Sequence, residues 1–98
     1  MEQSAERRQR ILVADDDPDA LGLLGRLTAE AGHHLVTAQD GETALALARE
    51  RQPDLVLLDL VMPGLDGLQV TRALKADDGL RSVPVVILSA RQAPADKV

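Results

Sequence analysis

The most informative segment of the sequence is Pro53-Asp54-Leu55-Val56-Leu57-Leu58-Asp59-Leu60-Val61-Met62-Pro63-Gly64-Leu65-Asp66-Gly67. Residues 55–58 are apolar at every position, a pattern typical of a strand buried on both faces of a parallel sheet. Asp59 follows directly, and a loop rich in turn residues comes after it. The carboxyl ends of central parallel strands are where open α/β sheets hold their ligands. Burying a charged carboxylate among Leu and Val costs free energy unless an opposite charge lies close to it. Asp59 therefore predicts a cation nearby.

Strands and helices are predicted to alternate outward from this stretch. Four apolar runs predict strands at residues 11–14, 35–38, 55–59 and 83–90. Three amphipathic segments predict helices: one from an N-cap at Asp17 to a stop at Gly32, one over 42–51 and one over 67–76. Alternation of this kind indicates an α/β fold with a parallel sheet.

The helical periodicity predicts which side chains face the sheet. The first helix is expected to use Leu21, Leu24, Leu27 and Ala31; the second Ala44, Leu45, Leu47 and Ala48; and the third Leu68, Thr71 and Leu74. His33 and His34 are interpreted as exposed residues at the entry to the second strand, because no third metal ligand recurs at a suitable spacing.

Composition bounds the class of protein. The 98 residues predict one small domain over 10–98, preceded by a charged tail at 1–9. A net charge of −5 argues against a nucleic-acid surface in this segment, and the absence of cysteine excludes disulfides. No apolar run approaches a membrane span or a signal-peptide core, so the chain is expected to be cytoplasmic.

Acidic residues gather where two of the predicted strands end. Asp15 and Asp16 follow the first strand and Asp59 ends the third, whereas Asp17 and Asp19 are explained by helix capping. Carboxylates held close together require a cation between them, and oxygen ligands favour Mg²⁺. Ser89 ends the fourth strand on the same edge, where its hydroxyl can donate to a phosphoryl oxygen. Together these residues predict phosphoryl transfer onto Asp59 as the nucleophile.

Three motifs occur in order along the sequence: Ile11-Leu12-Val13-Ala14-Asp15-Asp16-Asp17-Pro18-Asp19, Leu57-Leu58-Asp59-Leu60-Val61-Met62-Pro63-Gly64-Leu65-Asp66-Gly67 and Pro84-Val85-Val86-Ile87-Leu88-Ser89-Ala90. Together they closely resemble the receiver domain of bacterial response regulators. The resemblance runs from about Arg10 to the end of the sequence. It implies a flavodoxin-like, doubly wound sheet with strand order 2-1-3-4, and a signalling domain of a two-component phosphorelay, not an enzyme.

The resemblance also implies roles for individual residues. Asp59 corresponds to the phosphoacceptor, which takes a phosphoryl group from a histidine kinase or phosphotransfer protein. Asp15, Asp16 and Asp59 hold Mg²⁺ with the backbone carbonyl of Val61, and Ser89 matches the switch hydroxyl. An output domain in a longer parent chain is also expected.

One departure from the family pattern lies at the carboxyl end. The family carries a lysine at the end of a fifth strand. Lys97 lies in what resembles the start of the fourth helix, so it does not match that lysine. The fifth strand and its helix are missing, and we interpret the chain as a fragment of a longer regulator. We therefore expect self-association through the fourth strand, whose edge is left open.

Two other functions are compatible with part of the sequence. A phosphorylation-impaired receiver remnant that acts as an interaction module is the alternative that the missing lysine favours. An aspartate-nucleophile hydrolase of the haloacid dehalogenase kind requires a second Asp two positions after the nucleophile. Val61 occupies that position after Asp59, and Asp15 with Asp17 has the spacing but Asp17 fits a helix cap.

Overall fold

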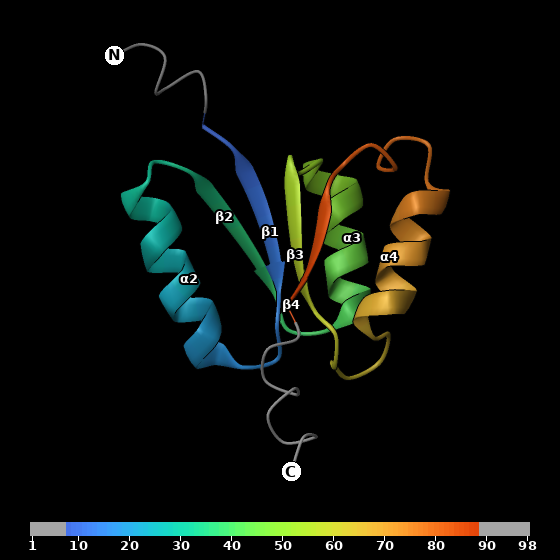
Figure 1. The fold of residues 1–98 in the computed structure, drawn as a ribbon, viewed down its shortest axis with the longest axis horizontal. Coiled ribbons are helices and arrows are strands. Elements are labelled where there is room, and N and C mark those ends of the chain that lie inside the picture. Colours follow the sequence, from blue (N-terminus) through green and yellow to red (C-terminus); the bar gives the residue numbers. More distant parts are fainter. Residues whose placement is uncertain (1–7, 89–98) are drawn as a thin grey trace.

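The computed structural model describes residues 8–88, which form a four-stranded parallel sheet with three helices. The strand order is β2-β1-β3-β4, as the sequence predicted (Figure 1). The elements, in chain order, are β1 (Arg10–Ala14), α2 (Pro18–Glu30), β2 (His34–Ala38), α3 (Gly41–Arg51), β3 (Leu55–Asp59), α4 (Gly67–Ala76) and β4 (Val85–Leu88).

The sheet is the middle of three layers. Helix α2 lies against one face, and α3 and α4 lie against the other (Figure 1). In β1 and β3 alternate residues enter two different cores: Leu12 and Leu58 belong to the larger core under α3 and α4, whereas Ile11 and Val13 belong to the smaller core under α2. Strands that contribute to both cores have no polar face, which explains why these runs are apolar throughout.

Aspartates begin all three helices. The side chains of Asp17, Asp40 and Asp66 accept hydrogen bonds from backbone N–H groups of the first turn. The N–H of Thr43 donates to Asp40 Oδ1 at 2.7 Å, and this bond lowers the pKa of the Asp40 carboxyl from its usual value. The predicted capping role of Asp17 is thus confirmed.

The predicted burial of the helices is only partly confirmed. In α3, Ala44, Leu45 and Ala48 are buried and Leu47 packs beside them, as expected. In the other two helices the predicted face was wrong at some positions. The exposed side chains are Leu27 (51%), Ala31 and Leu68 (51%), and the buried face of α4 is formed by Val70 and Leu74. Apolar spacing alone does not fix the rotation of a short helix when leucines lie on several of its sides.

Some predicted boundaries also change. Strand β1 begins at Arg10, one residue earlier than predicted, and Arg10 pairs in register with His34. His34 is exposed at the start of β2 as expected, but His33 is half-buried and its Nδ1 accepts a hydrogen bond from the Gln9 N–H. Strand β4 begins at Val85, two residues later than predicted; its predicted last residues, 89 and 90, lie outside the described residues.

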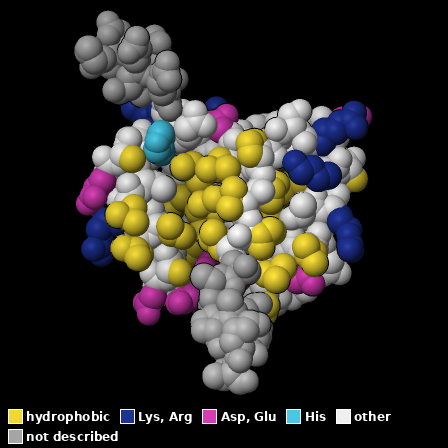
Figure 2. Space-filling model, viewed as in Figure 1, with side chains coloured by type: hydrophobic (Ala, Val, Ile, Leu, Met, Phe, Trp, Pro, Cys, Tyr) yellow, Lys and Arg dark blue, Asp and Glu magenta, His cyan; other side chains and the backbone are white. Residues whose placement is uncertain are grey.

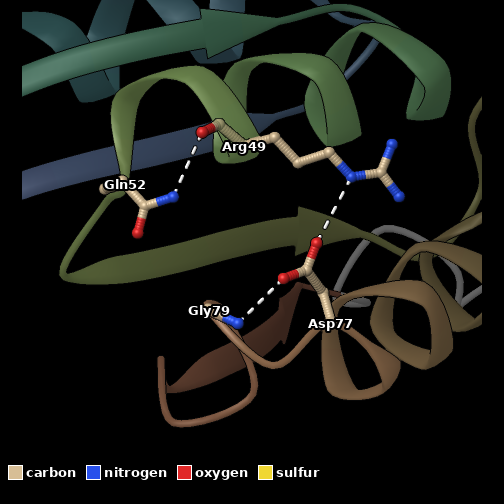
Figure 3. Close-up of polar contacts among 4 residues, drawn as sticks. All are labelled: Arg49, Gln52, Asp77 and Gly79. Carbon is tan, nitrogen blue, oxygen red and sulfur yellow. Dashed lines mark hydrogen bonds and ion pairs between the residues drawn. The ribbon is translucent and has the colours of Figure 1, made fainter.

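Polar contacts hold the connection between α4 and β4 (Figure 3). Asp77 accepts a hydrogen bond from the Gly79 N–H at 2.9 Å and forms an ion pair with Arg49 Nε of α3 at 3.5 Å. Lys75 Nζ donates to the carbonyl oxygens of Arg81 and Val83. Because the side chains of Arg49 and Asp77 are partly exposed to solvent, their ion pair contributes at most about 1 kcal/mol to the free energy of unfolding. Packing supplies most of the stability.

The face under α2 is incompletely covered near β4. Hydrophobic side chains gather in the middle of the surface in Figure 2, between α2 and the other two helices. Large apolar side chains exposed on α2 and β4 include Leu23 (54%), Leu27 and Val86 (45%).

Of the helices in residues 8–88, none combines the length and apolar character that crossing a membrane requires.

Glycine at position 41 is predicted to be indispensable for packing α3 against the loop before α4. A Cβ at Gly41 would overlap the backbone carbonyl oxygen and the Cβ of Leu65, so we expect Gly41→Ala to lower the free energy of unfolding by about 1–3 kcal/mol. Gly22→Ala is the matched control, because nothing lies within 4 Å of that Cβ in the interior of α2. It should raise stability by about 0.5–1 kcal/mol. Urea unfolding measures both variants, and equal effects would contradict the packing argument.

The outer edge of β4 is unpaired within residues 8–88, which predicts self-association of the 98-residue polypeptide. Within residues 8–88 β4 pairs with β3 alone, and it carries no charged residue that would repel a second strand. Val86→Lys should weaken association, whereas Leu68→Lys, which also adds a charge at an exposed apolar position but on α4, should not. Sedimentation over a concentration series tests this expectation. A concentration-independent monomer of the unsubstituted polypeptide would show it to be wrong.

Candidate functional site

Three carboxylates converge at the carboxyl edge of the sheet. One oxygen from each of Asp15, Asp16 and Asp59 lies within 4.8 Å of the other two. The side chains differ in environment: Asp59 is 1% exposed and Asp15 is 6% exposed, whereas Asp16 lies open to solvent. The site therefore has a buried floor and one accessible side.

Strand pairing brings these residues together. Strands β1 and β3 are parallel neighbours with Ala14 opposite Leu58, so the next residues, Asp15 and Asp59, emerge side by side. The Asp15 N–H donates to the carbonyl oxygen of Ala38 at 3.0 Å, which extends the ladder with β2 by one residue. These backbone bonds hold the two buried carboxylates in place because neither strand end is free to move independently.

Local hydrogen bonds orient the carboxylates. Asp15 Oδ1 accepts from the Asp17 N–H at 3.0 Å, and Asp59 Oδ1 accepts from the Val61 N–H at a longer 3.4 Å. The Leu60 N–H donates to the carbonyl oxygen of Leu88 at 3.3 Å, which ties the loop after β3 to the end of β4. Both donors belong to the loops that follow β1 and β3, so these loops help to orient the two buried carboxylates.

The donor set fits a hard divalent cation. Three carboxylates this close repel one another, and two of them lie in a low-dielectric environment that strengthens the repulsion. All the available ligand atoms are oxygens, which favours Mg²⁺ over metals that prefer nitrogen or sulfur. The exposed side at Asp16 leaves room for the water molecules that Mg²⁺ retains.

Gly67 shapes the site in a way that the sequence did not reveal. A Cβ at Gly67 would lie 2.7 Å from the Asp59 carbonyl oxygen and 3.0 Å from the Leu60 Cα. The first turn of α4 can therefore pack directly against the end of β3 only because residue 67 has no side chain. The sequence predicted a helix that begins at residue 67, but no local signal indicated this close approach.

The predicted site residues separate into two groups. Asp15, Asp16 and Asp59 are brought together, and Val61 lies in the loop directly after Asp59. The carbonyl of Val61 as a metal ligand stays a prediction. Ser89 lies outside the described residues, as does Lys97, which was not predicted to belong to the site.

The sequence is similar to known proteins over most of its length. The sequence matches the family described as the response regulator receiver domain over residues 11–98. It is 42% identical over 89 residues to the protein PilH of Pseudomonas aeruginosa, covering 91% of this chain and 74% of PilH. It is 46% identical over 91 residues to the DNA-binding response regulator MtrA of Mycolicibacterium smegmatis, covering 93% of this chain but only 39% of MtrA.

Comparison of folds points the same way. The receiver domain of the sensor histidine kinase PA1611 from Pseudomonas aeruginosa superposes with a TM-score of 0.82 at 29% identity, covering 92% of this chain and 74% of that one. That structure is described with a magnesium ion coordinated in its active site cleft.

Proposed function

The chain belongs to the response regulator receiver domain family, and we propose that it accepts a phosphoryl group on Asp59 as part of a two-component signalling pathway. The observation that carries this proposal is the convergence of Asp15, Asp16 and Asp59 within 4.8 Å at one edge of the sheet. Receiver domains interact with histidine kinases or phosphotransfer proteins. We therefore propose that the phosphoryl donor is the phosphohistidine of such a partner.

The proposed reaction is an in-line displacement at phosphorus. A carboxylate oxygen of Asp59 forms a new bond to phosphorus as the bond to the histidine nitrogen breaks, and the imidazole leaves with a proton taken from water. Asp59 needs no deprotonating base, because a carboxylate is already the nucleophilic form. Burial of Asp59 and the hydrogen bond from the Val61 N–H limit the orientations that its side chain can adopt.

Mg²⁺ is the proposed cofactor of this site. The carboxylates of Asp15, Asp16 and Asp59 would hold it, with the carbonyl of Val61 as a further ligand. When bound, the ion neutralises negative charge on the phosphoryl oxygens. The hydroxyl of Ser89 is proposed to donate a hydrogen bond to the transferred phosphoryl group.

The proposed domain begins at residue 10, where β1 starts, and the charged segment 1–9 precedes it. The chain spans 39% of the length of MtrA and 20% of that of the response regulator PleD of Caulobacter vibrioides. We propose, on this basis, that the domain controls an output domain in a longer parent protein. Its role would be a signalling switch and not catalysis of metabolite turnover.

Mg²⁺ binding should depend on Asp16. We expect Asp16→Asn to weaken Mg²⁺ affinity on the order of tenfold, because one of three clustered carboxylates loses its charge. Asp19→Asn is the matched control: it removes the same charge from the first turn of α2, outside the cluster. Amide-shift NMR titration with Mg²⁺ measures both affinities. If Asp16→Asn binds as the unsubstituted chain does, the proposed ligand set is wrong.

Phosphate uptake should depend on Asp59. With Mg²⁺ and a small acyl phosphate donor, we expect one phosphoryl group per chain and its loss on hydroxylamine treatment, which cleaves an acyl phosphate but not a serine phosphate. Asp59→Asn should abolish uptake, whereas Asp54→Asn, at the opposite end of β3, should retain it. Intact-mass spectrometry provides the readout. Label that persists in Asp59→Asn would move the chemistry to another residue, and no label in the unsubstituted chain would favour the interaction-module alternative.

A further inference from the structure

A second polar site lies at the opposite edge of the sheet, where the strands begin. A cavity of about 280 Å³ is lined by Arg10, His34, Val36, Glu50 and Arg51. Arg10 and His34 are the first residues of β1 and β2, and Glu50 and Arg51 end α3. We call this space the basic cavity. It is separated from the acidic cluster by the length of the parallel strands (Figure 1).

Backbone contacts position the basic residues. Arg10 and His34 lie side by side because β1 and β2 pair in that register. Arg10 Nη1 donates to the Arg51 carbonyl oxygen at 2.7 Å, and the Arg10 N–H donates to Asp54 Oδ2 at 2.8 Å. Arg10 is thus fixed at both its backbone and its guanidinium. One bond to Arg51 leaves most of the five guanidinium N–H donors of Arg10 for other acceptors.

Within residues 8–88, no ion pair involves the charged side chains that line the basic cavity. The ion pairs of residues 8–88 join Arg49 to Asp77 and Arg81 to Asp78, and neither involves Arg10, Arg51 or Glu50. Figure 3 shows the contrast at the end of α3, where the Arg49 side chain reaches across to Asp77. The two guanidinium groups of the cavity can therefore receive an external anion without breaking an existing pair.

We propose that the basic cavity binds a small molecule through a single oxyanion group, a carboxylate or a phosphate, held by Arg10 and Arg51. Guanidinium groups match the geometry of planar and tetrahedral oxyanions, and the imidazole of His34 offers one more polar contact. Val36 provides an apolar wall for a short carbon chain. Glu50 repels a second anionic group, so the site discriminates against polyanions. The volume lies just below the roughly 300–1,000 Å³ of typical ligand pockets, which suits a small ligand.

The test is an amide-shift NMR titration of the metal-free 98-residue chain. Inorganic phosphate and acetate are the two probes, each compared with sodium chloride at equal ionic strength. We expect saturable shifts at Arg10, His34 and Arg51 with at least one probe. Saturation by phosphate alone would assign the ligand to phosphates, and saturation by acetate alone would assign it to carboxylates; either result supports the site.

Three variants separate the basic cavity from a general effect of charge. Arg51→Gln should weaken binding about fivefold, the value of one exposed charge-assisted contact. Arg49→Gln removes the same charge from the same turn of α3 but does not line the cavity, and it should bind as the unsubstituted chain does. Glu50→Gln should tighten binding because a repulsive charge is lost.

Two results would overturn the proposal. One is linear, non-saturating shifts with both probes; the other is equal weakening by Arg49→Gln and Arg51→Gln. Asp59→Asn should leave anion binding unchanged, since Asp59 lies at the other edge of the sheet. The proposal of an anion site in the basic cavity can therefore fail without affecting the proposed phosphorylation of Asp59, and the reverse also holds.

Discussion

The parallel pairing of β1 with β3 is the constraint on which the rest of the molecule depends. It places Ala14 beside Leu58, so the acidic residues that follow each strand are forced together at one edge. Side chains that alternate along these strands supply both hydrophobic cores, and those cores hold the register. Shifting one strand by one residue would exchange its two faces and separate the carboxylates. Stability and the candidate site therefore rest on the same hydrogen-bonded ladder.

The same parallel arrangement gives the domain two chemically different edges. Asp15, Asp16 and Asp59 lie together at the carboxyl edge, where a bound cation would reduce the repulsion between their carboxylates. At the amino edge, Arg10 lies beside His34 and the end of α3, and the guanidinium groups there favour the binding of an anion. An acidic chain with a net charge of −5 thus retains a local basic surface. Net charge describes the average behaviour of a domain and not the preference of each site.

Close approach of backbone segments decides how the helices surround the acidic edge. Gly67 lets α4 begin against the carbonyl of Asp59, and Gly41 lets α3 begin against Leu65. Both glycines stand at helix starts immediately after a capping aspartate. The aspartate stabilises the first turn, and the glycine lets that turn approach its neighbour. Short loops can then connect the layers without displacing the carboxylates.

The fold class and the three clustered aspartates could be predicted from the sequence, because apolar runs, turn residues and caps act within a few positions of the residues they affect. Parallel strands then place both strand ends at one edge, so Asp59 and Asp15 follow from topology alone. Tertiary packing determined which side of each helix is buried and which residues line the basic cavity. In α2 and α4, Leu27 and Leu68 face solvent, and Arg10 lies in the sheet beside the end of α3. These features depend on contacts between residues far apart in the chain, which no local pattern encodes.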